Sequence, residues 1–260
     1  MATVRFDFSG EHVLVTGASR GIGYGVAEAF ARAGADVTVL ADDAGVEDAA
    51  VALTRDTGHE VRPIRCDITD REAVGAALAG IERIDVLVNN AGLERITPLA
   101  EDGREVENVF RRIVDVNMMG TYYVTRQAAP KLTEGGRIVF TASVWSRVAV
   151  PDFSAYCATK HATLGFMRSM AHELGPRGIR VNAVCPGWVR TDASMLSLKK
   201  MSERTGIAEE TLLGDIVGAQ VFSGLMEPGD IASLYLFLAS DAAANITGQA
   251  VVIDRGEVMA

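Results

Sequence analysis

The stretch His12-Val-Leu-Val-Thr-Gly-Ala-Ser-Arg-Gly-Ile-Gly23 decides the fold of this chain. A short apolar run is followed by Gly17, Gly21 and Gly23, and then by a pattern of helical period. The order of strand, glycine turn and helix is typical of a phosphate-binding loop, because glycines let the backbone approach a pyrophosphate and the helix N-terminus stabilises the anion. The stretch therefore predicts a dinucleotide site, with a merely flexible turn as the alternative.

Short apolar segments rich in β-branched residues recur along the chain, separated by segments of helical period. After the glycine turn, Ile22, Val26, Phe30 and Ala33 form one apolar stripe, and Gly34 offers a stop. Seven strands that alternate with helices predict a doubly wound α/β fold, whose parallel sheet is covered on both faces. The predicted strands are 13–16, 37–40, 61–65, 86–88, 138–141, 179–184 and 250–253.

We expect one domain over residues 1–260, because no linker rich in Pro, Gly or Ser divides the chain. The stretch 192–227 breaks the alternation, and we predict that it forms short helices that close over a substrate as a lid. Ordinary peripheral packing is the alternative for this stretch. Ligands of such sheets bind at the carboxyl ends of the strands, where Gly17, Asn89 and Ser143 are expected to meet.

The composition argues against several classes of protein. With 48% hydrophobic residues and no apolar run of about 18 residues, the chain is not expected to span a membrane. A net charge of -9 disfavours nucleic acid as a partner. Cys66, Cys157 and Cys185 show no spacing typical of a disulfide framework or a zinc site. The first residues lack the pattern of a secretion signal, so we expect a cytoplasmic protein.

Three side chains predict proton transfer at an alcohol or ketone. Tyr156 and Lys160 are four residues apart and share one face of a helix, where a fixed positive charge favours the phenolate. Ser143 precedes them and can hold a carbonyl oxygen. Each has an ordinary alternative: a ring in the core, a solvated charge and the end of a strand.

The chain resembles the classical short-chain dehydrogenase/reductase family through six segments, which follow the family's order and usual spacing over nearly the whole chain. The resemblance implies a Rossmann-like fold and reversible hydride transfer between C4 of a nicotinamide and a carbinol carbon. The segments are Thr16-Gly-Ala-Ser-Arg-Gly-Ile-Gly23, Asn89-Asn-Ala-Gly92, Asn117, Ser143, Tyr156-Cys-Ala-Thr-Lys160 and Pro186-Gly-Trp-Val-Arg-Thr191.

The resemblance also implies a role for each catalytic residue. Tyr156 would take the proton, Lys160 would lower the pKa of that tyrosine and hold the nicotinamide ribose, and Ser143 would bind the substrate oxygen. Asn117 would bend a helix and hold a water that relays protons, with a helix cap as its ordinary alternative. No metal is needed for this chemistry.

The choice between NAD and NADP depends on charges near the adenosine ribose. Asp42 and Asp43 would repel a 2′-phosphate and Arg20 would attract one, so we expect NAD, with NADP possible. The family's usual acidic position falls on Ala41, one residue earlier. Asp67 resembles the family's adenine-binding carboxylate, with a helix cap as the alternative. The implied cofactor-binding residues are Gly17, Ser19, Arg20, Gly21, Ile22, Gly23, Asp42, Asp67, Ile68, Asn89, Asn90, Ala91, Gly92, Tyr156, Lys160, Pro186, Gly187, Val189 and Thr191.

Arginine and tryptophan near the expected site favour a small polyol, sugar or sugar acid, because arginine pairs with carboxylates and tryptophan stacks on the apolar face of a sugar. A 3-oxoacyl group on a carrier protein, reduced with NADPH, is a second hypothesis, which the acidic charge of the chain disfavours. A cofactor-binding regulatory protein without turnover is a third. The predicted substrate residues are Ser143, Arg95, Trp145, Arg147, Phe153 and Trp188.

Two segments resemble the long helices through which members of the family dimerise. These are residues 104–131 and 154–174, and they predict a homotetramer whose further contacts involve the C-terminal strand. Arg255 stands after that strand, where the family usually places glycine, so the contact near it is less secure.

Overall fold

Seven parallel strands form one sheet in the computed structural model, which describes residues 5–101 and 103–259. Residues 1–4 belong to the segment in which a secretion signal was sought, and they lie outside the described residues, as do 102 and 260. The strand order is β3-β2-β1-β4-β5-β6-β7, and every predicted strand is present. The strands are β1 (His12–Thr16), β2 (Asp36–Ala41), β3 (Val61–Arg65), β4 (Ile84–Asn89), β5 (Leu132–Thr141), β6 (Arg180–Pro186) and β7 (Ala250–Ile253).

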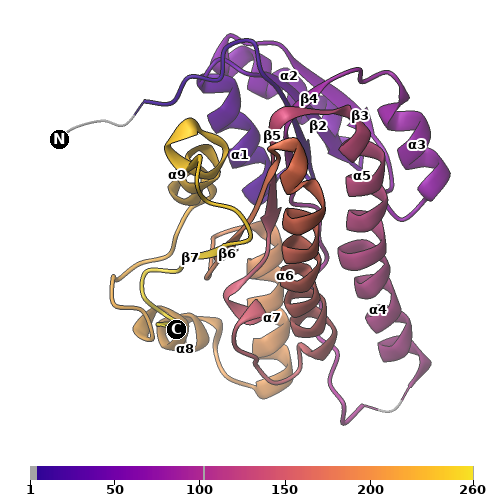
Figure 1. The fold of residues 1–260 in the computed structure, drawn as a ribbon. Helices are drawn as coiled ribbons and strands as arrows, with labels where there is room; N and C mark the ends of the chain where they lie inside the picture. The colour runs from indigo at the N-terminus through magenta and orange to yellow at the C-terminus, as the bar shows by residue number, and fades with distance from the viewer. Residues whose placement is uncertain (1–4, 102, 260) are drawn as a thin grey trace.

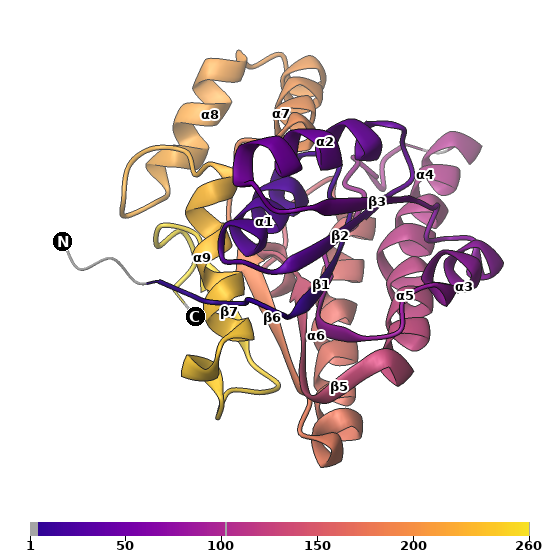
Figure 2. The same ribbon diagram turned by 90° about the horizontal axis from the view of Figure 1, so that it is seen from above.

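Helices cover both faces of the sheet, as the apolar strands predicted (Figures 1 and 2). Successive residues of a strand point to opposite faces, so Val13 and Val15 join one core cluster while Leu14 joins the other. The first cluster packs under α1 (Gly21–Arg32), α2 (Gly45–Thr57) and α9 (Pro228–Ala239); the second packs under α3 (Arg71–Ala79), α5 (Thr121–Ala128) and α6 (Ser154–Leu174).

Strand β5 begins earlier than the sequence pattern indicates. Leu132 pairs with Ile84, but Arg137 pairs with Val86, so the register shifts between these two contacts. Gly135 lies between them with a φ of +73°. The segment ahead of residue 138 is polar and contains glycine, so it lacks the continuous apolar run by which the other strands were predicted.

The segment predicted as one long helix over 104–131 changes its winding along its length. Helix α4 (Arg104–Val114) continues into a π-helical turn (Asp115–Gly120), then into α5 and a final 3₁₀ turn. Gly120 closes the π turn, and a Cβ there would lie 2.6 Å from Cγ1 of Ile68. The irregular turn carries Asn117, and π turns of this kind are frequent at functional sites.

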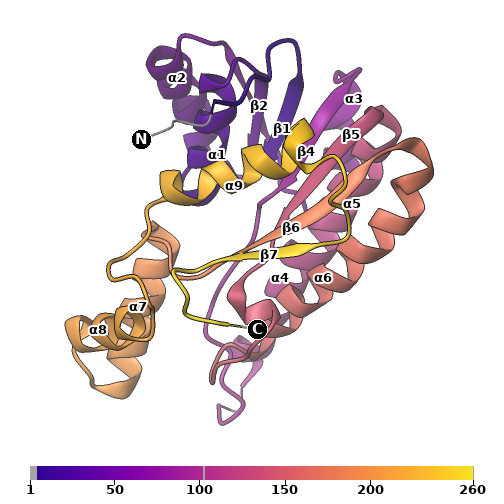
Figure 3. The same ribbon diagram turned by 60° about the vertical axis from the view of Figure 1, so that its left-hand side comes forward.

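The stretch 192–227 forms the short helices α7 (Asp192–Thr205) and α8 (Glu209–Gly218), which lie apart from the sheet in Figure 3. Helix α7 begins shortly after the carboxyl end of β6, with Thr191 as its N-cap. Across residues 5–101 and 103–259, no helix has both the length and the apolar character required to cross a membrane.

Candidate functional site

A cavity of about 570 Å³ opens at the carboxyl ends of the strands. It lies beside β1, where the strand order reverses. From β1 the chain first builds β2 and β3 on one side, and then β4 to β7 on the other side. Ligands of open α/β sheets bind at such a switch point. The predicted residues that line the cavity are Gly17, Ser19, Arg20, Gly21, Ile22, Asp42, Asp67, Ile68, Asn90, Ala91, Gly92, Arg95, Ser143, Trp145, Tyr156, Lys160, Pro186, Gly187, Trp188, Val189 and Thr191.

Five predicted residues are absent from the described lining of this cavity. Three of them support the wall from behind: Gly23 packs against the glycine turn, Asn89 donates to Thr125, and Asn117 binds the loop after β4. The other two were expected to touch a substrate. They are Arg147 and Phe153.

The glycine turn has the close backbone packing that its sequence predicts. Gly17 and Gly21 have φ values of +64° and +60°, which favour glycine. At Gly23, a Cβ would lie 2.3 Å from the carbonyl oxygen of Gly17. Helix α1 begins directly after this turn without a side-chain cap, so its first N–H groups are available to an anion in the cavity.

The ends of β1 and β4 are held together by Asn90 and Thr16. The Asn90 side chain donates to the carbonyl oxygens of Thr16 and Gly17 at 3.0 Å each. In return, the Thr16 hydroxyl accepts from the backbone N–H groups of Asn90 and Ala91. The glycine turn and the loop after β4 therefore form one rigid wall.

Opposite charges meet at the end of β2. Arg20 of the glycine turn donates to Asp43 at 3.0 Å, and the same carboxylate accepts from the Ser19 hydroxyl and from the backbone N–H of Gly45. These bonds outweigh burial and hold the pKa of Asp43 below its ordinary value. Asp42 is exposed beside them on the cavity wall. The arginine that would attract a 2′-phosphate is thus paired with a carboxylate.

Asp67 forms a second charged contact, at the end of β3. Its carboxylate accepts from the backbone and hydroxyl of Thr69 and from Arg112 of α4 at 3.1 Å. Although burial alone would raise it, the pKa of Asp67 is lowered by these donors. The helix cap that was the alternative role for Asp67 is supplied instead by Asp70, whose side chain accepts from the first turn of α3. Arg112 also lines the cavity, and no local sequence signal places it there.

Asn117 uses both ends of its amide to fix the loop after β4. Its Oδ1 accepts from the backbone N–H of Leu93 at 2.7 Å, and its Nδ2 donates to the carbonyl oxygen of Leu93 and to the hydroxyl of Thr159, each at 3.0 Å. The side chain is buried. Asn117 therefore ties the π turn to the cavity wall and to α6, the helix that carries Tyr156 and Lys160.

Tyr156 and Lys160 lie on the same face of α6, next to the end of β5. The Lys160 ammonium is buried and donates to the carbonyl oxygen of Thr141 at 2.7 Å, and it lies 5.4 Å from the centre of the Tyr156 ring. Two residues beyond Thr141, the Ser143 hydroxyl accepts from the backbone of Trp145. All three predicted side chains thus face one cavity, from two elements.

The pKa of Tyr156 shifts in the direction opposite to our prediction. Burial and, next to it, the negative charge of Glu94 raise the pKa of the phenol, whereas the neighbouring Ser143 hydroxyl acts to lower it. Burial also lowers the pKa of Lys160 to about 8. The expectation that Lys160 depresses the tyrosine's pKa is wrong for this structure, because desolvation of the phenol dominates. The phenol is therefore protonated at neutral pH.

The substrate side of the cavity is aromatic. Trp145 packs against Phe153 at 4.9 Å between ring centres and against Tyr156 at 5.8 Å, so Phe153 stands behind the tryptophan. Trp188 is buried and also lines the cavity. Arg147 is exposed and donates to the carbonyl oxygen of Ala250, which directs it away from the predicted position on a substrate.

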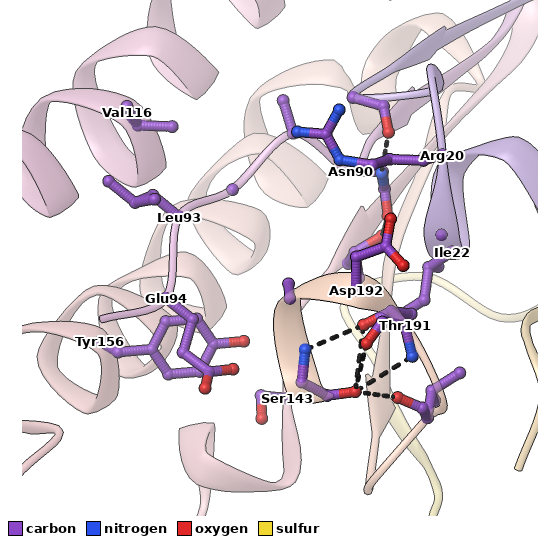
Figure 4. Close-up of a pocket in the computed structure, with 18 of the residues that line it drawn as sticks. Arg20, Ile22, Asn90, Leu93, Glu94, Val116, Ser143, Tyr156, Thr191 and Asp192 are labelled. Atoms are coloured by element: carbon purple, nitrogen blue, oxygen red, sulfur yellow. Dashed lines mark hydrogen bonds between the residues drawn. The ribbon is translucent and has the colours of Figure 1, made fainter. Parts of the chain in front are cut away.

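Helix α7 contributes to the cavity wall. Thr191 and Ser194 form a reciprocal capping box at the start of the helix. Asp192, Ser194 and Leu196 then line the cavity, whereas α8 supplies none of the described lining residues. Figure 4 shows Thr191 and Asp192 across the cavity from Glu94 and Tyr156.

Glu94 is a lining residue within the expected pocket segment 93–96, and the sequence analysis gave it no role of its own. It follows Gly92 in the loop after β4 and contributes a carboxyl group to the wall (Figure 4). Its position in a loop beyond a strand's carboxyl end is a signal that could have indicated it. Within the described part of the chain, no three His, Cys, Asp or Glu side chains are arranged to hold a metal ion.

Comparison with known proteins shows relatives along nearly the whole chain. A family model described as enoyl-(acyl carrier protein) reductase matches residues 17–257. Oxidoreductase UcpA of Salmonella typhimurium is 36% identical over 261 residues, covering 96% of this chain and 95% of that protein. The 2-dehydro-3-deoxy-D-gluconate 5-dehydrogenase of Pseudoalteromonas atlantica is 32% identical over 263 residues, covering 97% of both.

Solved structures share the complete fold. The L-sorbose reductase from Gluconobacter frateurii, solved in complex with NADPH and L-sorbose, superimposes with a TM-score of 0.88 and 25% identity, over 99% of this chain and 100% of that one. A short-chain type dehydrogenase/reductase from Mycobacterium ulcerans gives a TM-score of 0.84 with 32% identity, over 97% of this chain and 91% of that one.

Proposed function

Because the chain belongs to the short-chain dehydrogenase/reductase family, we propose that it is a nicotinamide-dependent enzyme that interconverts a ketone and a secondary alcohol on a small polyol, sugar or sugar acid. The observation that carries this proposal is the convergence of Ser143, Tyr156 and Lys160 with the glycine turn on one cavity. Proton-transfer groups and a phosphate-binding loop on one cavity are what hydride transfer to a carbonyl requires.

The residues present fit a dinucleotide. The glycine turn leaves no room for a Cβ at Gly17, where it would lie 2.6 Å from Cα of Ala91, and the uncapped start of α1 suits a pyrophosphate. Asp67 and Ile68 would flank the adenine, Asn90 to Gly92 the second ribose, and Pro186 to Thr191 the carboxamide. When bound, the dinucleotide supplies or accepts the hydride.

The remaining steps belong to side chains of the chain itself. Ser143 would hold the carbonyl oxygen by a hydrogen bond, and Tyr156 would donate its proton to that oxygen during reduction. A phenol of raised pKa is ready for this direction, because it is protonated at neutral pH. Lys160, held on Thr141, would bind the ribose and return a proton to the phenol.

We expect NAD to be the preferred dinucleotide. The Arg20 guanidinium is paired with Asp43 at 3.0 Å, and Asp42 adds an exposed carboxylate to the same corner of the cavity. A 2′-phosphate would meet more negative than positive charge there. The L-sorbose reductase neighbour was solved with NADPH, so both dinucleotides belong in the assay.

A sugar or polyol substrate agrees with the aromatic walls and with two relatives. Trp145 and Trp188 offer apolar faces on which a sugar ring can stack. The relatives are named for L-sorbose and for 2-dehydro-3-deoxy-D-gluconate. The second candidate is a 3-oxoacyl group on a carrier protein. The description of the matching family model names an acyl carrier protein, although with an enoyl group, and the net charge of -9 disfavours such a partner.

One assay tests the proposal. The purified chain is mixed with NADH or NADPH and with a panel of ketoses, keto acids, simple ketones and a 3-oxoacyl thioester, and the oxidation of the dinucleotide is followed. Reduction of a ketose or keto sugar acid that is lost in Tyr156→Phe would support the proposal. Binding of dinucleotide without turnover of any panel member would favour the regulatory alternative.

Self-association is part of the proposal. Phe110, Met119 and Tyr122 are exposed in the single chain along α4, the π-helical turn and α5, a segment that resembles the family's dimer contact. Burial of such side chains favours association. We propose a homotetramer in the cytoplasm; light scattering that gave the mass of one chain at micromolar concentration would contradict the assembly.

A further inference from the structure

The loop after β4 places a carboxyl group beside the phenol of Tyr156. Glu94 lines the cavity, its charge acts on Tyr156, and Figure 4 shows the two side chains together. The loop is fixed immediately before Glu94, because both backbone groups of Leu93 are bonded to the Asn117 side chain. Glu94 is therefore presented to the cavity from a rigid backbone.

The Glu94 carboxyl is incompletely paired. Its Oε1 is buried and has no hydrogen-bond partner among the described residues. Most buried polar atoms in proteins have such a partner, and the exceptions call for a ligand or another explanation. An oxygen of this kind on the wall of a substrate cavity is suited to a hydrogen bond from a bound molecule.

The two nearby cations donate hydrogen bonds to backbone carbonyl oxygens and not to the Glu94 carboxyl. The Arg95 guanidinium donates to the backbone carbonyl of Glu94, and the Lys160 ammonium donates to Thr141. Burial raises the pKa of Glu94, although the Ser197 hydroxyl and the charges of Lys160 and Arg95 act to lower it. An unpartnered carboxyl oxygen can accept a hydrogen bond from a hydroxyl, and it does not require an ammonium partner to do so.

We infer that Glu94 binds a second hydroxyl group of the substrate, on the carbon next to the reacting carbonyl, so that the preferred substrates are α-hydroxyketones and the matching diols. This inference rests on the proposed function, which places the reacting oxygen at Ser143 and Tyr156. A carboxyl beside that phenol reaches a substituent on the adjacent carbon. It also disfavours a substrate carboxylate at that position, because two acidic groups would then share the site.

The test compares ketones that differ by one group of similar size. The purified full chain is assayed for the reduction of two pairs of ketones, with NADH and with NADPH. The first pair is 3-hydroxybutan-2-one and 3-methylbutan-2-one, and the second is 1-hydroxybutan-2-one and pentan-3-one. Three variants are compared with the wild type: Glu94→Leu removes both oxygens, Glu94→Gln keeps a donor and an acceptor, and Glu72→Gln changes an exposed carboxylate of α3 away from the cavity.

We expect Glu94→Leu to lower kcat/KM for the hydroxyketones by about 10- to 100-fold, mainly through KM, and to change kcat/KM for the isosteric ketones by less than about threefold. Glu94→Gln should stay within about fivefold of wild type, since its amide can still bond to a hydroxyl. Glu72→Gln should be unchanged. Thermal denaturation checks folding, and Glu94→Leu should be at least as stable, because it removes an unpaired buried carboxyl group.

An equal loss on both members of each pair in Glu94→Leu would overturn the inference, and so would no loss on either member. A wild type that reduces only the ketones without a hydroxyl would also overturn it, while leaving the proposed reduction intact. A wild type that reduces no ketone of any class with either dinucleotide would contradict the proposed function itself, and the inference with it.

Discussion

The buried ammonium of Lys160 donates a hydrogen bond of 2.7 Å to the carbonyl oxygen of Thr141 at the end of β5. Ser143 follows two residues later, and Tyr156 lies one helical turn before Lys160 on α6. This one bond therefore connects the element that carries the hydroxyl to the element that carries the phenol. Burial of the same ammonium lowers the pKa of Lys160 to about 8.

Replacing Lys160 by methionine should change the pH dependence of stability. The unfolded chain binds the lysine proton up to pH 10.5 and the folded chain only up to about pH 8, so the wild type gains stability as pH rises between these values. Lys160→Met lacks this gain. Without added dinucleotide, the melting temperature of the wild type minus that of Lys160→Met should therefore be larger at pH 10 than at pH 7. A difference that is the same at both pH values would contradict the buried charge.

Tyr156→Phe should abolish turnover while leaving the fold intact and changing dinucleotide binding far less than turnover, because the other cofactor-binding residues remain. Loss of the proton donor is expected to lower kcat by about 10³-fold, whereas the ring keeps its contact with Trp145. Calorimetric titration of NADH should give a dissociation constant close to that of the wild type. Tyr24→Phe on α1, outside the described cavity lining, is the control, and a similar loss in that variant would point to a general effect of removing a phenol.

Asn117→Ala should destabilise the chain by about 2–4 kcal/mol, because it removes three hydrogen bonds and leaves the backbone groups of Leu93 and the hydroxyl of Thr159 without this partner. Urea denaturation followed by circular dichroism measures the free energy of unfolding. Asn245→Ala, at an exposed position, should stay within about 0.5 kcal/mol of wild type. Equal stability of both variants would show that the amide network contributes little.

Gly23→Ala should weaken dinucleotide binding by at least about tenfold and lower the melting temperature. The added Cβ would lie 2.3 Å from the carbonyl oxygen of Gly17, which is backbone and cannot swing aside, so the turn itself must move. Gly80→Ala is the matched control, since nothing lies within 4 Å of a Cβ there and its φ is -79°. Normal binding in Gly23→Ala would show that this turn does not hold the pyrophosphate.

Asp43→Asn should shift the dinucleotide preference towards NADP. The amide keeps one acceptor oxygen for the backbone N–H of Gly45, and its NH₂ group can donate to the Ser19 hydroxyl, but it no longer neutralises Arg20. The ratio of kcat/KM for NADPH to that for NADH should therefore rise by about fivefold at low salt. Asp48→Asn, which removes an exposed charge from α2, controls for net charge. An unchanged ratio in Asp43→Asn would mean that the pair with Arg20 does not set the choice.

Much of the architecture could be predicted because it is encoded locally. Short continuous runs of apolar, β-branched residues give the strands, which are buried on both faces, and one apolar stripe gives α1. The second half of β5 followed this rule, whereas its first half, with the bulge around Gly135, did not. Apolar patterns in the sequence were therefore sufficient to predict a strand only where its backbone is regular.

The sequence by itself determined the doubly wound sheet, the glycine turn and the convergence of Ser143, Tyr156 and Lys160, because each follows from local periodicity and from the rule that parallel strands share one carboxyl edge. Only the tertiary structure decided the pairing of Arg112 with Asp67, the position of Glu94 beside the phenol and the raised pKa of Tyr156. Those features depend on which side chains from distant segments meet and how far water is excluded from them. The path of a loop and the depth of a cavity produce no periodic pattern of residues, so the sequence alone does not predict them.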